Sequence, residues 1–144
     1  MPSPVFVFDA YGTLFDVHAC IARYAADAGP EGQRMSEIWR TKQLEYTWLT
    51  SLMISPAALR PDFAAVTAQG LDFALAALGI ELGAGDRARL QLAYLTLAPF
   101  PDVAAALARL APRPRWILSN GTLAMLEPLV RHTGLDAHLD GVLS

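Results

Sequence analysis

Two short apolar runs lie about a hundred residues apart, and the segment between them has a helical pattern. The runs, Val5–Phe8 and Arg115–Leu118, contain β-forming residues, and each ends at polar residues, as buried parallel strands do. A crossover between parallel strands usually needs little more than one helix. The simplest account is an α/β core with an all-helical insertion after its first strand.

The predicted fold class is therefore α/β, with a parallel-sheet core and a helical cap. We place the core at residues 1–15 and 98–144 and the cap at residues 16–97. Gly141–Leu143 is expected to begin a third strand at the point where the chain ends. Because two or three parallel strands leave an uncovered apolar edge, we expect that the chain carries only the first half of the core.

The helices are predicted from their start and stop signals. The longest of them has apolar residues on more than one face, so we expect several neighbours to contact it. The predicted starts are Asp16, Ser36, Asp62, Asp86, Asp102 and Thr122, and the corresponding ends lie near Ala28, Met53, Gly79, Leu97, Leu110 and His132.

Composition excludes several classes of protein. With 53% apolar and 17% charged residues, the chain is not intrinsically disordered. A net charge of -3 and the lack of a basic run argue against a nucleic-acid partner. No apolar stretch reaches the roughly 18 residues of a membrane span, and the first residues do not resemble a signal peptide. A soluble, cytoplasmic protein with no membrane partner is expected, and the single cysteine, Cys20, fits a reducing compartment.

Candidate catalytic residues follow both apolar runs. Asp9 ends the first run at the edge where open α/β sheets bind ligands, although in isolation a role in capping a turn explains it better. Thr13 places a hydroxyl within reach of the Asp9 carboxylate, and amides in this turn can bind an anion, which indicates a positioned carboxylate nucleophile. Ser119 and Asn120 end the second run. They read as an ordinary turn when taken alone, but their expected closeness to Asp9 favours a shared anion site.

These residues and the long predicted helix carry a resemblance to a known family. Phe8–Asp16 (FDAYGTLFD) with Leu118–Gly121 (LSNG) resembles the haloacid dehalogenase superfamily. The segment Ile38–Met53 resembles the first cap helix of the L-2-haloacid dehalogenases and is more specific than the aspartate motif. The resemblance covers essentially the whole chain and implies a Rossmann-like core with an inserted cap.

Position 11 separates two chemistries within this superfamily. The resemblance implies that a phosphatase would carry a second aspartate two residues after the nucleophile, where it binds magnesium, but this chain has Tyr11. A tyrosine cannot replace that carboxylate in an octahedral magnesium site. No metal and no cofactor are therefore expected, and the three histidines show no metal-ligand spacing.

The resemblance implies hydrolytic dehalogenation of short L-2-haloalkanoic acids to 2-hydroxy acids through an ester on Asp9, with Thr13 as a further catalytic residue. Ser119 and the backbone amides of Ala10 and Tyr11 would hold the substrate carboxylate. Arg40, which could otherwise be an ordinary surface arginine, would receive the departing halide together with Asn120. The remaining substrate-binding residues implied are Thr41, Leu44 and Phe63, with the Tyr11 side chain beside Leu44.

The expected partners are a small halogenated carboxylic acid, a halide ion and a second copy of the chain, bound through the cap as a homodimer. Two alternatives stay open. One is a magnesium-dependent phosphatase of the same superfamily. The other is a non-catalytic fragment with a helical dimerisation cap, because the family's essential lysine belongs to a segment after position 144.

Overall fold

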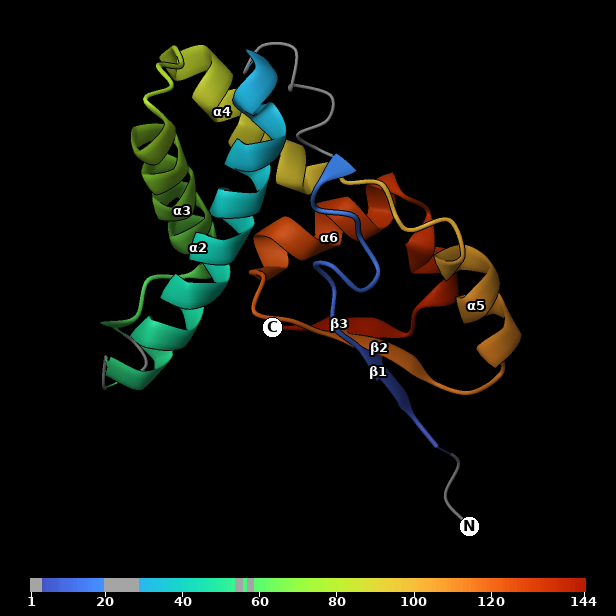
Figure 1. Cartoon of the computed structure of the whole chain (residues 1–144). Coiled ribbons are helices and arrows are strands. Elements are labelled where there is room, and N and C mark those ends of the chain that lie inside the picture. The colour runs from blue at the N-terminus through green and yellow to red at the C-terminus, as the bar shows by residue number, and fades with distance from the viewer. Residues whose placement is uncertain (1–3, 20–28, 54–55, 57–58) are drawn as a thin grey trace. The chain divides into compact units, whose positions relative to one another are not determined.

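The computed structural model describes residues 4–19, 29–53, 56 and 59–144. The chain divides into two compact units: unit 1 contains Met1–Val17 and Ala93–Ser144, and unit 2 contains His18–Leu92. Figure 1 shows both units with the secondary-structure labels used below. The helix predicted from Asp16 to Ala28 falls mostly on residues 20–28, which lie outside the described residues, as does Cys20.

Unit 1 is built on a three-stranded parallel sheet in the order β1-β2-β3. In register, Phe8 pairs with Ile117, which in turn pairs with Val142. The α/β fold class and all three predicted strands are thus confirmed. The elements of this unit are β1 (Phe6–Phe8), the 3₁₀ turn η3 (Ala93–Leu95), α5 (Val103–Leu110), β2 (Arg115–Leu118), α6 (Leu123–His132), the 3₁₀ turn η4 (Leu135–His138) and β3 (Gly141–Leu143).

One face of this sheet is covered and the other carries exposed apolar side chains. Ile117 on the covered face is fully buried, and α5 and α6 lie on one side of the sheet in Figure 1. Val7, Leu118 and Leu143 share the opposite face by register, and each is about half exposed. Because side chains alternate between the faces of a strand, the register alone assigns them to opposite sides.

Unit 2 is helical in its described part. It contains the 3₁₀ turn η1 (Gly29–Glu31), α2 (Gly32–Met53), α3 (Phe63–Leu78) and α4 (Ala84–Leu92). Figure 1 shows α2 and α3 packed along each other. Both helices carry buried apolar side chains, including Met35, Trp39, Leu71, Ala74 and Leu75.

Two predicted helix starts were wrong. The helix α2 begins at Gly32 rather than at Ser36, because the Ser36 hydroxyl is buried inside the helix and hydrogen-bonded to Nδ1 of His18 at 2.8 Å. The helix α4 begins at Ala84 and ends at Leu92, and Asp86 lies within its first turn, where it pairs with Arg89. A carboxylate in the first turn favours a helix without being its N-cap.

The last turns of α2 also differ from expectation. Trp48, Leu49 and Leu52 were expected to be contacted from several sides, but they are 60%, 49% and 84% exposed. The buried part of α2 lies nearer its start, at residues such as Met35 and Trp39. None of the helices in the described part of the chain is long and apolar enough to cross a membrane.

Candidate active site

Asp9 directly follows β1, and the loop after it folds back on a single carbonyl group. The oxygen of Ala10 accepts hydrogen bonds from the backbone N–H groups of Thr13, Leu14 and Phe15 at 2.9–3.3 Å. This tight turn needs a backbone φ of 89° at residue 12, which glycine adopts without strain. The loop brings the Thr13 hydroxyl to 3.5 Å from Oδ2 of Asp9, where it donates a long, weak hydrogen bond. Asp9 and Thr13 are both exposed.

Ser119 and Asn120 follow the neighbouring strand, β2, at the same edge of the sheet. The backbone N–H of Ser119 donates to the carbonyl of Leu143 at 3.1 Å, which ties this loop to β3. The Ser119 side chain is buried, and its Oγ accepts a hydrogen bond from the N–H of Gly121 at 3.2 Å. A hydroxyl that accepts can still donate its own proton, so Ser119 can bind an anion. Asn120 is exposed.

The Tyr11 ring joins these two loops. It is 3% exposed and lies against the backbone of Gly121, where an added Cβ would be only 2.6 Å from Cε2 of the ring. Its centroid is 5.8 Å from that of Tyr94, with the two rings tilted by 52°. Tyr11 therefore holds the loop after β1 against the loop after β2.

Arg40 lies on α2 in unit 2, and a buried glutamine binds its guanidinium. Nη1 of Arg40 donates to Oε1 of Gln43 at 2.6 Å, and Nε2 of Gln43 donates to Oγ1 of Thr67 on α3 at 2.6 Å. Gln43 is fully buried, and Thr67 is 2% exposed. The indole N–H of Trp39 donates to the carbonyl of Thr67 at 2.7 Å, so α2 and α3 share polar contacts inside an apolar interface.

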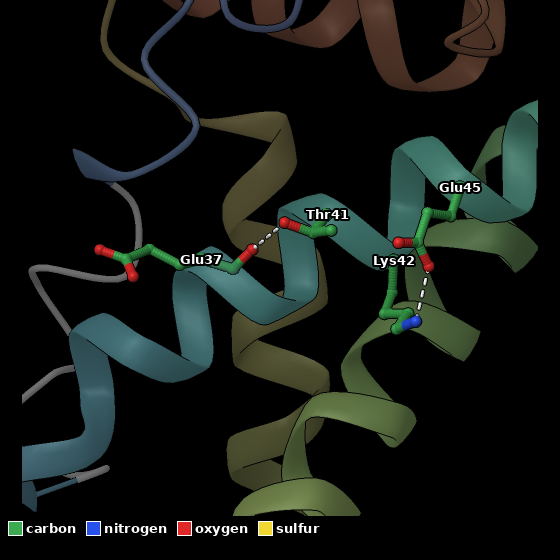
Figure 2. Close-up of polar contacts among 4 residues, drawn as sticks. All are labelled: Glu37, Thr41, Lys42 and Glu45. Carbon is green, nitrogen blue, oxygen red and sulfur yellow. Dashed lines mark hydrogen bonds and ion pairs between the residues drawn. The ribbon is translucent and has the colours of Figure 1, made fainter.

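The other candidates from unit 2 lie in different surroundings. Thr41 is exposed, and its hydroxyl donates to the carbonyl of Glu37 at 2.8 Å, as Figure 2 shows. Leu44 is half-buried, and Phe63 is buried at the first turn of α3. The Thr41 proton is therefore already engaged, while the hydroxyl oxygen can still accept.

Lys42 points to a neighbouring carboxylate and an aromatic ring. Its Nζ is 2.6 Å from Oε2 of Glu45, as Figure 2 shows, and 4.5 Å from the centroid of the Phe73 ring on α3. The hydrogen bond to the Glu45 carboxylate raises the pKa of Lys42 above its ordinary value of 10.5. The ammonium is thus fully charged at neutral pH and stabilises the contact between α2 and α3.

The candidates fall into two groups, one in each unit. Unit 1 brings six of them to the carboxyl edge of two adjacent strands: Asp9, Ala10, Tyr11, Thr13, Ser119 and Asn120. Unit 2 carries the remaining four, on α2 and at the start of α3: Arg40, Thr41, Leu44 and Phe63. Within the described ranges, no three His, Cys, Asp or Glu side chains gather closely enough to hold a metal ion.

Comparison with known proteins defines the class to which this fold and sheet edge belong. The family model described as haloacid dehalogenase-like hydrolase matches residues 4–144, and the chain belongs to this family. The (S)-2-haloacid dehalogenase of Xanthobacter autotrophicus is 46% identical over 139 residues, which are 96% of this chain and 53% of that enzyme. The (S)-2-haloacid dehalogenase of Pseudomonas sp. (strain YL) is 42% identical and is covered to 58%.

A solved structure shows that the similarity to these dehalogenases extends to the fold. It is the L-2-haloacid dehalogenase from Xanthobacter autotrophicus with chloropropionic acid covalently bound, with a TM-score of 0.87 and 42% identity. The match covers 97% of this chain and 56% of that one. The chain therefore spans about half the length of the relatives that it matches, and its resemblance to the dehalogenases, inferred above from the motifs, is confirmed.

Proposed function

We propose that the complete protein, including any residues beyond position 144, hydrolyses short L-2-haloalkanoic acids to 2-hydroxy acids and halide. The observation that carries this proposal is the pairing of β1 with β2, which brings Asp9 to the same sheet edge as Ser119 and Asn120. Further support comes from relatives named (S)-2-haloacid dehalogenase and from a similar structure that holds chloropropionic acid covalently.

In the proposed first step, an oxygen of the Asp9 carboxylate attacks the α-carbon from the side opposite the halogen. A carbon–oxygen bond forms as the carbon–halogen bond breaks, the halide leaves with the bonding electrons, and the configuration inverts. The Ser119 hydroxyl and the amides of Ala10 and Tyr11 hold the substrate carboxylate. Thr13 donates its hydrogen bond to Asp9 and orients it. Donors aimed at a developing charge stabilise a transition state most in a water-poor site.

In the second step, water attacks the carbonyl carbon of the ester on Asp9. The bond from this carbon to the ester oxygen breaks, and the 2-hydroxy acid leaves with an oxygen that came from Asp9. One proton of the water goes to the new hydroxyl group and the other to solvent. Neither step transfers a phosphoryl group, so we propose that neither a metal nor a cofactor is required.

We propose that the cap comprises residues 16–97, which include all of unit 2, and that residues 1–15 and 98–144 form the core. Arg40 and Asn120 would receive the halide, and Tyr11, Thr41, Leu44 and Phe63 would contact the rest of the substrate. The exposed apolar residues on the last turns of α2 support a homodimer formed through this cap. We propose the cytoplasm as the compartment, on the basis of the composition.

The experiment that tests this function is one turnover of 2-chloropropanoate in oxygen-18 water. The label is expected in the Asp9 carboxylate, while the product of the first turnover stays unlabelled. Asp16 lies seven positions further on and serves as an internal control, since fragmentation of the same peptide should find it unlabelled. Label in the product during the first turnover would show direct attack by water and would contradict the ester route.

A second arm separates this function from the magnesium-dependent phosphatase alternative. Chloride release is expected to continue after chelation with EDTA, and p-nitrophenyl phosphate is expected to be a poor substrate. Tyr11 supports this expectation, because its ring is buried against Gly121 where a phosphatase would carry a metal-binding aspartate. Magnesium-dependent phosphate release without chloride release would instead establish the phosphatase.

A further inference from the structure

A chain of hydrogen bonds leads from the backbone of α3 to the guanidinium of Arg40. Oγ1 of Thr67 donates to the carbonyl of Phe63 at 2.6 Å, Gln43 lies 2.6 Å from Thr67, and Arg40 lies 2.6 Å from Gln43. The two middle residues are buried, whereas Arg40 is partly exposed. The chain therefore begins at a fixed backbone group in the interior and ends at a charge near the surface of the unit.

The donors in this chain run in one direction. A threonine hydroxyl has a single proton, and that of Thr67 goes to the carbonyl of Phe63. Its oxygen must then accept from the side-chain amide of Gln43, which presents its NH₂ group to Thr67. The other end of the amide, Oε1, consequently faces Arg40 as an acceptor. The network thus determines which way the buried amide points.

A buried amide at a helix contact is costly, and an apolar side chain would pack there without that cost. What Gln43 adds is a neutral acceptor aimed at a cation. A carboxylate at this place would hold the guanidinium as well, but its charge would weaken the attraction of Arg40 for an anion. A neutral oxygen fixes the guanidinium without placing a negative charge of its own beside it.

We infer that Gln43 is a positioning residue that holds the Arg40 guanidinium in one orientation, and that Thr67 sets the orientation of Gln43. This inference rests on the proposed function, in which Arg40 receives the departing halide. A guanidinium fixed in advance loses little freedom when the halide forms, so the hydrogen bond lowers the barrier of the first step rather than strengthening substrate binding.

The test compares Gln43→Met and Thr67→Val with Thr50→Val in the complete protein. Thr50 is a matched control, because in the part of the chain that the structure describes its hydroxyl bonds carbonyls of its own helix, those of Tyr46 and Thr47. Rotation of the Arg40 guanidinium about its Nε–Cζ bond is measured by NMR on protein labelled with nitrogen-15 arginine. The steady-state parameters kcat and KM are measured from chloride release with 2-chloropropanoate.

Gln43→Met is expected to speed the guanidinium rotation and to lower kcat, each by about tenfold, with KM within about twofold of the original. Thr67→Val is expected to speed the guanidinium rotation and to lower kcat as well. Thr67→Ser, which keeps the hydroxyl, should leave the rotation rate and kcat as in the original protein, and so should Thr50→Val. If Gln43→Met does not fold, the comparison of Thr67→Val with Thr67→Ser tests whether the network holds Arg40. A purely structural role for Thr67 would lower stability without freeing Arg40.

Two results would overturn the inference: an unchanged Arg40 rotation in the folded variants, or a freed guanidinium with an unchanged kcat. Failure of the proposed function would look different, because the unsubstituted protein would then release no chloride from 2-chloropropanoate. In that case the NMR comparison still decides whether Gln43 holds Arg40, while the positioning role in dehalogenation would be rejected with the function.

Discussion

Tyr11 and Gly121 come from different loops, and the ring of Tyr11 leaves no room for a side chain at residue 121. An added Cβ would lie 2.6 Å from the Tyr11 ring and 3.1 Å from Leu126. Gly121→Ala is therefore expected to lower the free energy of unfolding by about 1–3 kcal/mol, as overpacking usually does. The measurement is the urea unfolding midpoint of the complete protein.

Gly85→Ala on α4 is the control for this change, since nothing lies within 4 Å of an added Cβ there. It should leave stability unchanged or raise it slightly, because alanine favours a helix over glycine. Adding Tyr11→Leu to Gly121→Ala should recover part of the loss, because the two residues are in contact. A Gly121→Ala protein as stable as the original would refute the close contact between the two loops.

Arg40 gives the second prediction at this scale. Lysine keeps the charge but loses the planar fork of donors, so Arg40→Lys is expected to lower turnover roughly a hundredfold, about 2.7 kcal/mol of barrier. Chloride release from 2-chloropropanoate measures it. Arg34→Lys is the control, because Arg34 is exposed on the first turn of α2 and has an ion pair of 3.7 Å with Glu31. If Arg40→Lys and Arg34→Lys had equal turnover, Arg40 would have no role in the reaction.

The candidates on the sheet edge could be predicted from the sequence, and Gln43 could not. Asp9 and Ser119 each follow an apolar strand, so a local pattern is enough to bring them to one edge once the strands are parallel. Gln43 lies in the motif that suggested the family, but its partner Thr67 is 24 positions away on another helix. The only local signal was the spacing of three residues from Arg40, which places both side chains on one helix face.

Among the helices, α3 and α5 both begin after an aspartate, yet only one of the two carboxylates caps its helix. Asp62 accepts a hydrogen bond from the N–H of Ala65 at 2.8 Å, whereas Asp102 makes no side-chain cap bond. Asp62→Ala is therefore expected to cost about 1 kcal/mol of stability. Asp102→Ala, the matched control, should change the urea unfolding midpoint little. Equal losses would mean that the carboxylates act through the helix dipole alone.

The helix boundaries show where local signals suffice. Asp62 and Gly79 were predicted as the ends of α3, and the structure confirms both, because capping involves residues only a few positions apart. Ser36 has the composition of an N-cap as well, but its hydroxyl is bound to His18, which lies 18 positions earlier. A competing partner this distant in the sequence cannot be recognised from the residues around Ser36, so α2 starts one turn earlier than expected.

For the whole molecule, the exposed apolar end of α2 predicts self-association. Leu52→Asp is expected to raise the dissociation constant of the proposed homodimer by at least about tenfold, since an aspartate in an apolar contact is left without a partner. Sedimentation equilibrium measures this constant. Leu92→Asp is the control, because Leu92 is also exposed, at 60% against 84% for Leu52, but lies on α4. A monomer in the unsubstituted protein would refute the homodimer.

The parallel sheet could be predicted from the sequence, but the exposure of one of its faces could not. Continuous apolar runs indicate parallel strands covered on both faces. In the described structure Val7 and Leu143 are nonetheless about half exposed, although their sequence pattern resembles that of buried residues such as Ile117. The apolar pattern of a strand does not show which element covers it. That the chain carries only the first half of the core therefore stays a prediction.

The pairing of Phe8 with Ile117 also has a consequence for synthesis on the ribosome. The two residues are about a hundred positions apart, and all of unit 2 lies between them. At about 5–20 residues per second, the first strand waits roughly 5 to 20 s for its neighbour, while the continuous unit 2 can already fold. Asp9 thus gains its place on the sheet only after all of unit 2 has been synthesised. A nascent chain stalled before residue 115 would contain Arg40, Gln43 and Thr67 but not the second strand of the sheet.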